Sequence, residues 1–292
     1  MKTKFEELDE RMGGFQEGHL ILLGGRPAMG KTAFLLSLLD NVCLEGEECC
    51  VVFSLEHEKK AFLQRLAELH AGISVHASKD NEEYYERTRA AYVRMEKSKL
   101  WIWDDVDLSV REMLGKCQEV AKREKIGLIA IDYIQLINEK GFGLKKWKTR
   151  QVIKQLKKMA KRFRCPVLLL SQLSKSADLR WEHRPILADI KGVKAELADD
   201  VLLLYRYDYY EQNPETEKVA ELEIAKGERA TGERVRLYFS REYGHFFTDW
   251  IDEGDKNEMT GERPDDKNGQ GMEIRSSRKI LDKGSKSGYI HV

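Results

Sequence analysis

Short apolar runs recur along the first 205 residues and alternate with stretches of helical periodicity. Several runs are apolar at nearly every position, which is typical of strands buried on both faces of a parallel sheet. They are residues 19–24, 49–54, 100–103, 127–132, 166–170 and 200–205. Because such strands alternate with helices, the chain is predicted to be an α/β protein, its parallel sheet covered by helices on both faces.

Two helices and an antiparallel extension complete this prediction. Ser109 and Glu112 indicate a capping box that opens a helix running to about Arg123. A second helix ends before Pro166, and its apolar face comprises Val152, Leu156, Met159, Ala160 and Phe163. After residue 215, VAELEIA and RVRLYF alternate apolar and polar positions, which predicts two antiparallel edge strands joined by the turn AKGERATGE.

Composition narrows the class of protein. The 50 basic and 50 acidic residues cancel, so any surface for nucleic acid must be local. Five cysteines without a CxxC pair predict reduced thiols in a cytoplasmic protein. A charged N-terminus argues against a signal peptide, and no apolar run approaches the ~20 residues of a membrane span. We expect an ordered domain at 1–252 and a polar, disordered tail at 253–292.

The sequence GRPAMGKT matches the phosphate-loop pattern GxxxxGK[ST] in full and stands between a predicted strand and a predicted helix. In such a loop, backbone N–H groups and the lysine bind phosphates, and the last residue binds Mg²⁺. The predicted cofactors are ATP, or another NTP, and Mg²⁺. The predicted nucleotide-binding residues are Gly25, Arg26, Pro27, Ala28, Met29, Gly30, Lys31 and Thr32.

Three further strand ends carry polar residues. Asp132 is predicted to be the second magnesium partner, since a carboxylate is needed there beside a phosphate loop. Glu56 fits two interpretations equally well, as a residue that orients an attacking water or as an acidic helix N-cap. Gln172 could contact the γ-phosphate, although a hydrogen-bonded strand end is the simpler interpretation.

Residues 140–164 hold eleven Lys and Arg residues and no acidic one. A solvated helix face is the usual explanation of a charge run, but the lack of acids in a neutral chain favours binding to a nucleic-acid backbone. The predicted contacts are Lys140, Lys145, Lys146, Lys148 and Arg150. No HExxH, Cys/His cluster or Ser/His/Asp arrangement supports zinc binding or nucleophilic catalysis.

Together, the ordered motifs resemble the motor domain of DnaB-like replicative DNA helicases over roughly residues 4–250. Besides the phosphate loop, the resemblance rests on VVFSLEHEKKAFLQRL, IGLIAIDYIQLI, PVLLLSQLS, HRPILADIK and DDVLLLYRYDYY. It implies a RecA-like P-loop NTPase core, a hexameric ring with NTP between subunits, and movement along single-stranded DNA. A helicase loader or primase is an implied partner.

The resemblance also assigns roles to residues. It makes Glu56 the catalytic carboxylate, Gln172 the coupler between γ-phosphate and DNA, and places Arg65 near the nucleotide. The segments at 139–148 and after Asp189 correspond to DNA-facing loops. The second of these loops is one residue shorter than in the family, and Lys191 and Lys194 preserve its charge.

Two other departures concern the oligomer. The family's N-terminal helical domain and linker helix are expected to be missing, which bears on ring stability and primase binding. The family places a Lys and an Arg, two apart, against the neighbouring subunit's γ-phosphate. Here Lys226 matches, Glu228 occupies the arginine position, and Arg229 follows it, so Lys226 and Arg229 are the predicted trans-acting residues.

The sequence therefore predicts an ATP-dependent DNA helicase or translocase. Two alternatives stay open: a DnaB-like or KaiC-like assembly or regulatory ATPase that does not unwind DNA, and a motor that needs a separate partner to form its ring.

Overall fold

A computed structural model describes residues 1–137, 145–190, 194–210 and 218–248, except for the side chains at 136 and 145–149. The predicted tail and the boundary at residue 252 lie outside these residues. Among the described helices, none combines the length and apolar character needed to cross a bilayer.

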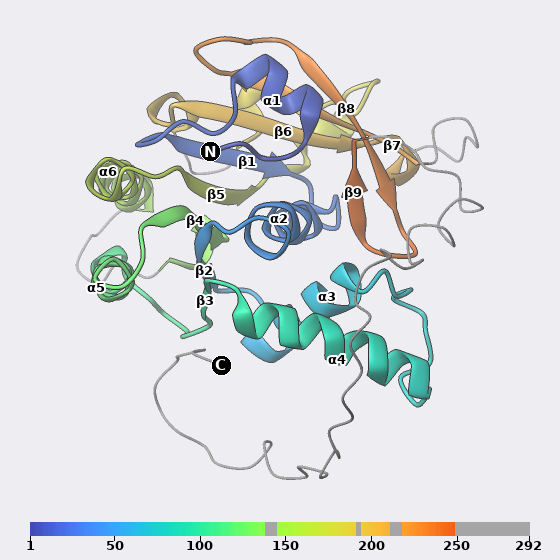
Figure 1. Cartoon of the computed structure of the whole chain (residues 1–292). Coiled ribbons are helices and arrows are strands. Elements are labelled where there is room, and N and C mark those ends of the chain that lie inside the picture. Colours follow the sequence, from blue (N-terminus) through green and yellow to red (C-terminus); the bar gives the residue numbers. More distant parts are fainter. Residues whose placement is uncertain (138–144, 191–193, 211–217, 249–292) are drawn as a thin grey trace. The chain divides into compact units, whose positions relative to one another are not determined.

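The described residues form one nine-stranded sheet (Figure 1). Its first six strands are parallel. In spatial order they are β3 (Leu100–Trp103), β2 (Cys49–Ser54), β4 (Ile126–Asp132), β5 (Val167–Gln172), β1 (Leu20–Gly25) and β6 (Asp200–Arg206). These are the six strands predicted from the apolar runs, within two residues at each end.

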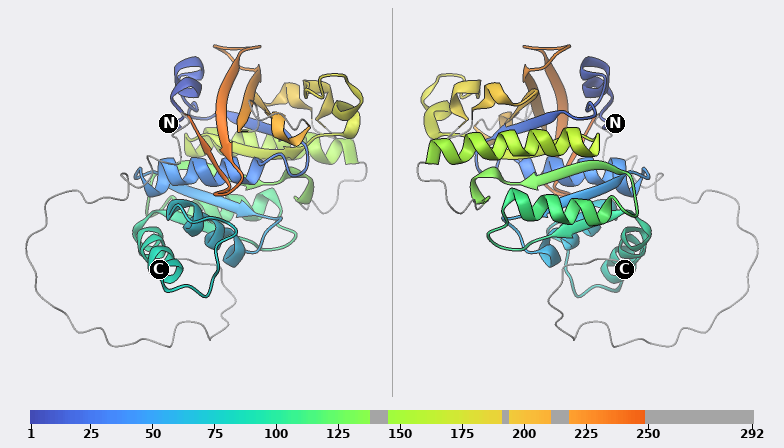
Figure 2. Two further views of the ribbon diagram at one scale, coloured as in Figure 1. Left: turned by 90° about the vertical axis from the view of Figure 1, so that its right-hand side faces the viewer. Right: turned by 90° about the vertical axis from the view of Figure 1, so that its left-hand side faces the viewer.

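Helices cover both faces of the parallel strands, as predicted. One face packs against α2 (Lys31–Leu39), α3 (Lys59–His70) and α4 (Glu82–Lys97). The opposite face packs against α5 (Val110–Val120) and α6 (Lys145–Phe163), which lie side by side in the right-hand view of Figure 2. Each face buries its own apolar cluster, and all five cysteines are buried free thiols.

The helix signals in the sequence are confirmed. Glu112 N donates to Ser109 Oγ (3.3 Å) and Ser109 N donates to Glu112 Oε2 (2.8 Å), which completes the capping box. In α6, the predicted apolar face is buried except at Phe163, which is half-buried. The remaining short helices are α1 (Glu6–Met12), η1 (Asp40–Leu44), η2 (Ile134–Leu136), η3 (Lys175–Leu179), η4 (Leu187–Asp189), η5 (Ala195–Leu197) and η6 (Tyr207–Tyr209).

The sheet continues beyond β6 as an antiparallel extension of β7 (Val219–Lys226), β8 (Arg234–Ser240) and β9 (His245–Phe247). The sequence predicted β7 and β8 but not β9, because three residues are too few to show an alternating pattern. Phe246 N donates to Ser37 Oγ of α2 (3.0 Å), and the Phe246 ring meets the Phe34 ring edge-on. The extension is thereby fastened to the helix that follows the phosphate loop.

We expect Phe246→Ala to lower the free energy of unfolding by about 3–5 kcal/mol, because a buried ring between Phe34 and Phe239 would leave a cavity. Urea denaturation followed by circular dichroism measures the change. Phe247→Ala, in the same strand but half-buried, is the matched control and should cost less. Equal losses for the two variants would contradict the packing role of Phe246.

Candidate active site

The candidate site lies at the edge of the sheet where the parallel strands have their carboxyl ends, the usual place for ligands in α/β folds. The phosphate loop follows β1, Glu56 follows β2, Asp132 ends β4 and Gln172 ends β5. A cavity of about 350 Å³ opens there. It is lined by Pro27, Ala28, Gly30, Lys31, Thr32, Ala33, Glu56, His57, Arg65, Gln172, Arg206, Phe239 and Gly244.

The phosphate loop turns into α2 at Gly30, whose φ of 101° lies in the left-handed region. A Cβ at this position would stand 3.1 Å from the Phe246 ring, so glycine meets both the backbone and the space requirement. The first N–H groups of a helix lack intrahelical partners and favour an anion. Since α2 begins at Lys31 beside the cavity, its N-terminus offers such donors there.

Lys31 is only 8% exposed, and its Nζ donates to the backbone oxygens of Gly25 and Arg26, each at 3.0 Å. Burial lowers the pKa of Lys31 to about 8, although the carboxylates of Asp132 and Glu56 act in the opposite direction. A phosphate in the cavity would compensate the buried charge and stabilise the protonated form.

Thr32 and Asp132 meet directly: Thr32 Oγ1 donates to Asp132 Oδ2 at 2.8 Å. Asp132 is 1% exposed, burial raises its pKa, and its Oδ1 has no hydrogen-bond partner among the described residues. Ligand atoms of Asp132, Glu56 and His57 lie within 4.8 Å of one another. A buried, unpaired carboxylate oxygen beside a hydroxyl fits a hard divalent cation such as Mg²⁺.

Gln172 lines the cavity while its backbone is held by Gln135. Gln135 Nε2 donates to Gln172 O (3.3 Å) and to Ser171 Oγ (3.1 Å). Arg65 is an exposed residue of α3 that lines the same cavity. The predicted residues Lys31, Thr32, Glu56, Asp132, Arg65 and Gln172 are therefore brought together by the fold.

Two residues of the phosphate loop have side chains directed elsewhere. Arg26 forms a two-bond ion pair with Asp178 of η3 (3.0 and 2.6 Å) and donates to Leu173 O (3.3 Å). Met29 is buried, and its Sδ accepts from Arg206 N at 3.2 Å. Through these contacts the two side chains fasten the loop to Asp178 and Arg206, and neither lines the cavity.

Sequence reasoning missed five residues that line the cavity: Ala33, His57, Arg206, Phe239 and Gly244. Arg206 ends the apolar strand β6, so the rule that singled out Asp132 and Gln172 would have found it. Its guanidinium pairs with Asp208 and lies 3.9 Å from the centroid of the Phe239 ring. Phe239 and Gly244 come from the antiparallel extension, and no local signal places them at this edge.

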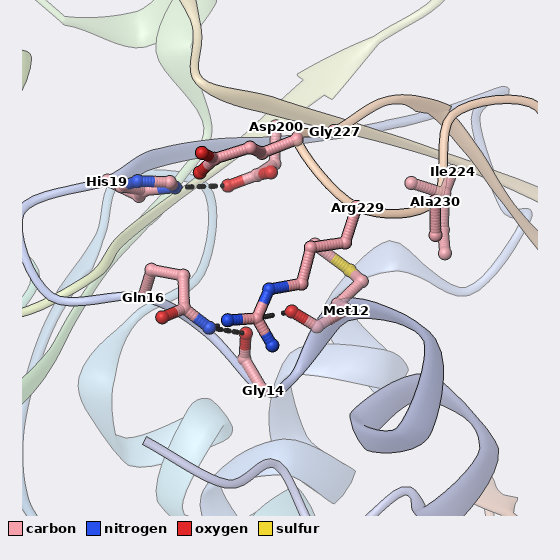
Figure 3. A pocket seen from close by; sticks show the side chains of 10 residues that line it. Met12, Gly14, Gln16, His19, Asp200, Ile224, Gly227, Arg229 and Ala230 are labelled. Carbon is pink, nitrogen blue, oxygen red and sulfur yellow. Dashed lines mark hydrogen bonds and ion pairs between the residues drawn. The ribbon is translucent and has the colours of Figure 1, made fainter.

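The two hairpin cations lie at the opposite edge of the sheet. Lys226 pairs with Val201 at the start of β6, and its ammonium donates to Glu196 O and Ala198 O. Arg229 stands one position after the place of the family's arginine, and it lies in the turn after β7. In a strand such a shift would move the side chain to the other face, but a turn does not impose that alternation. Figure 3 shows its guanidinium beside Met12, Gly14 and Gln16, and it has no hydrogen-bond partner among the described residues.

The predicted DNA contacts are described only in part. Lys194 is exposed, directly before η5, and Arg150 of α6 is half-buried. The side chains of Lys140, Lys145, Lys146, Lys148 and Lys191 lie outside the described residues.

Comparison with known proteins identifies the family. Residues 1–248 match the model of the DnaB-like helicase C-terminal domain. The chain is 33% identical to the replicative DNA helicase DnaC of Bacillus subtilis and 32% identical to the replicative DNA helicase DnaB of Geobacillus stearothermophilus. Each match covers 84% of this chain and 55% of the relative. The chain thus spans about half the length of these relatives.

Solved structures agree with this match. One of them, an ATPase domain, has a TM-score of 0.76 at 31% identity, covering 84% of this chain and 89% of that domain. A DnaB-like replicative helicase, solved in a study of its interactions with primase, has a TM-score of 0.78 at 30% identity, over 84% of this chain and 62% of that one. The RecA-like fold, the phosphate loop and these matches lead to one conclusion: the chain belongs to the family of DnaB-like helicase C-terminal domains.

Proposed function

We propose that this chain is an ATP-hydrolysing motor domain that acts on single-stranded DNA as a subunit of a hexameric ring. The observation that carries the proposal is the buried Asp132 carboxylate, which accepts from half-buried Thr32, keeps one oxygen unpaired among the described residues and lies near the buried Lys31 ammonium. Burying the Asp132 carboxylate and the Lys31 ammonium costs free energy. A bound ligand of suitable charge would offset that cost, so the two buried charges indicate a binding site.

In this proposal, Lys31 and the N-terminus of α2 bind the phosphates, and Thr32 and Asp132 hold Mg²⁺. Bound Mg²⁺ would neutralise charge on the β- and γ-phosphates. Glu56 follows β2, is exposed, lines the cavity and lies near Asp132. From this position it can orient a water toward the γ-phosphate. Gln172, at the end of β5, would contact the same phosphate.

The position of the hairpin supports action between subunits. The phosphate loop and the hairpin occupy opposite edges of one sheet, so Arg229 cannot serve the cavity of its own subunit. Its guanidinium has no partner among the described residues, as expected of a group kept for a neighbour. An arginine supplied in trans typically accelerates phosphoryl transfer by ~10³–10⁵.

Single-stranded DNA is the proposed track, with exposed Lys194 and half-buried Arg150 as the described contacts. A loader or primase is a further proposed partner. The five buried free thiols support a cytoplasmic location. The alternative is a nucleotide-dependent assembly ATPase that does not unwind DNA.

We expect the protein to hydrolyse ATP, and the rate to rise when single-stranded DNA is added at low salt. Lys31→Ala should abolish hydrolysis, because the buried cation is lost. Phosphate release by the assembled protein measures both effects. Lys97→Ala, an exposed lysine of α4 away from the cavity, is the control. Full hydrolysis by Lys31→Ala would refute the site, whereas hydrolysis without DNA stimulation would favour the assembly ATPase.

Asp178→Ala is expected to destabilise the phosphate loop, because it leaves the nearly buried Arg26 guanidinium without its carboxylate. We expect the free energy of unfolding to fall by about 1–3 kcal/mol, and the KM for ATP to rise. Urea titration and steady-state kinetics give the two values. The double variant Arg26→Met with Asp178→Ala should recover part of the stability, and additive losses would speak against the pair.

Arg229→Ala should lower turnover by about 10³ or more while nucleotide affinity is largely kept, since the arginine acts at the transition state. The sharper measurement mixes Arg229→Ala subunits with Glu56→Gln subunits. Each is inactive alone, but a mixed ring contains interfaces with an intact Glu56 and an intact Arg229, so part of the activity should return. Mixtures as inactive as their components would place Arg229 outside the reaction.

A further inference from the structure

The carbonyl end of η5 is held by two lysines from distant parts of the chain. Within the turn, Leu197 N donates to Lys194 O (3.0 Å) and Ala198 N donates to Ala195 O (3.1 Å). The following carbonyl oxygens, of Glu196, Leu197 and Ala198, point away from the turn, as the last carbonyls of any helical turn do. Lysine side chains are suitable partners for such groups.

Lys226 supplies the first ammonium. Its Nζ donates to Glu196 O at 2.9 Å and to Ala198 O at 2.5 Å, so one side chain of β7 bridges two carbonyls of η5. Lys157 of α6 supplies the second: its Nζ donates to Leu197 O at 3.4 Å and forms an ion pair with Asp199 at 2.8 Å. All three carbonyl oxygens therefore accept from an ammonium.

Among the described residues of this segment (194–199), it is Asp199 that is tied to the sheet. Asp199 N donates to Leu20 O, and Leu20 N donates to Asp199 Oδ2, each at 2.9 Å. At the other end stands Lys194, which is exposed and, with Arg150, is one of the two predicted DNA contacts whose side chains are described. The two lysines, together with the buried Ala195 and Ala198, hold η5 and so help to fix the place of Lys194.

We propose that Lys226 is a positioning residue for the DNA-facing segment, which it anchors through the carbonyls of Glu196 and Ala198. The inference rests on the proposed function in taking Lys194 as a DNA contact. It changes the assignment of the hairpin, because the ammonium of Lys226 is bonded to carbonyls of its own subunit. The Arg229 guanidinium, which lies beside Met12 and Gly14 without a hydrogen-bond partner in the described chain, is left to serve the neighbour.

Hydrogen exchange of the full chain, diluted to the monomer and free of nucleotide and DNA, tests the anchor alone, since no neighbour's phosphate is then present. Lys226→Met keeps the length of the side chain and removes the ammonium. We expect the amides of Leu197 and Ala198 to exchange about tenfold faster than in the wild type. Lys226→Arg should restore protection, and Arg229→Met should leave it unchanged. Unaltered exchange in Lys226→Met would overturn the proposal.

Binding of a fluorescent oligothymidine with a non-hydrolysable ATP analogue supplies the functional test. Lys226→Met should weaken DNA binding severalfold, whereas Arg229→Met should keep DNA affinity and lose turnover. A Lys226→Met protein that loses turnover but keeps its DNA affinity would show that Lys226 acts on phosphate only. Should Lys226→Met fail to fold by circular dichroism, Lys226→Leu, which also removes the ammonium, takes its place in both measurements. If the wild type itself binds no DNA, the proposed function fails, while the exchange experiment still decides the anchor.

Discussion

The hydrogen bond between Thr32 and Asp132 joins residues one hundred positions apart, and the candidate site depends on it. It can form only because β1 and β4 both pair with β5 in parallel, which brings their carboxyl ends to the same edge. In such a sheet a slip of one residue would turn the Asp132 side chain to the other face. The apolar clusters on both faces therefore hold the register that the polar pair requires.

The charges at this edge are buried at a free-energy cost. Desolvation lowers the pKa of Lys31 to about 8 and raises the pKa of Asp132, so each group is held in a state less favourable than in water. Two backbone carbonyls and one hydroxyl offset part of this cost. A bound phosphate with a divalent cation would offset more of this cost, which supports the proposed ligand.

The two edges of the sheet have different roles. The carboxyl edge carries the cavity, and the amino edge carries the hairpin and the carbonyl end of η5. Within the hairpin, Lys226 turns inward to its own backbone and Arg229 outward to the small hollow beside α1. Under the proposed function, a second subunit would be needed to bring Arg229 to a nucleotide, which would link assembly to hydrolysis.

The sequence by itself determined the six parallel strands, the β7–β8 hairpin, the phosphate loop and the polar residues that end the strands. These follow from local rules, because burial on both faces, alternation and loop chemistry are written in neighbouring residues. Long-range packing decided that Arg26 turns to Asp178, that Phe239 and Gly244 line the cavity, and that Lys226 holds η5. Each of those contacts joins elements far apart in the chain, and no pattern of neighbouring residues specifies which distant group a long side chain will meet.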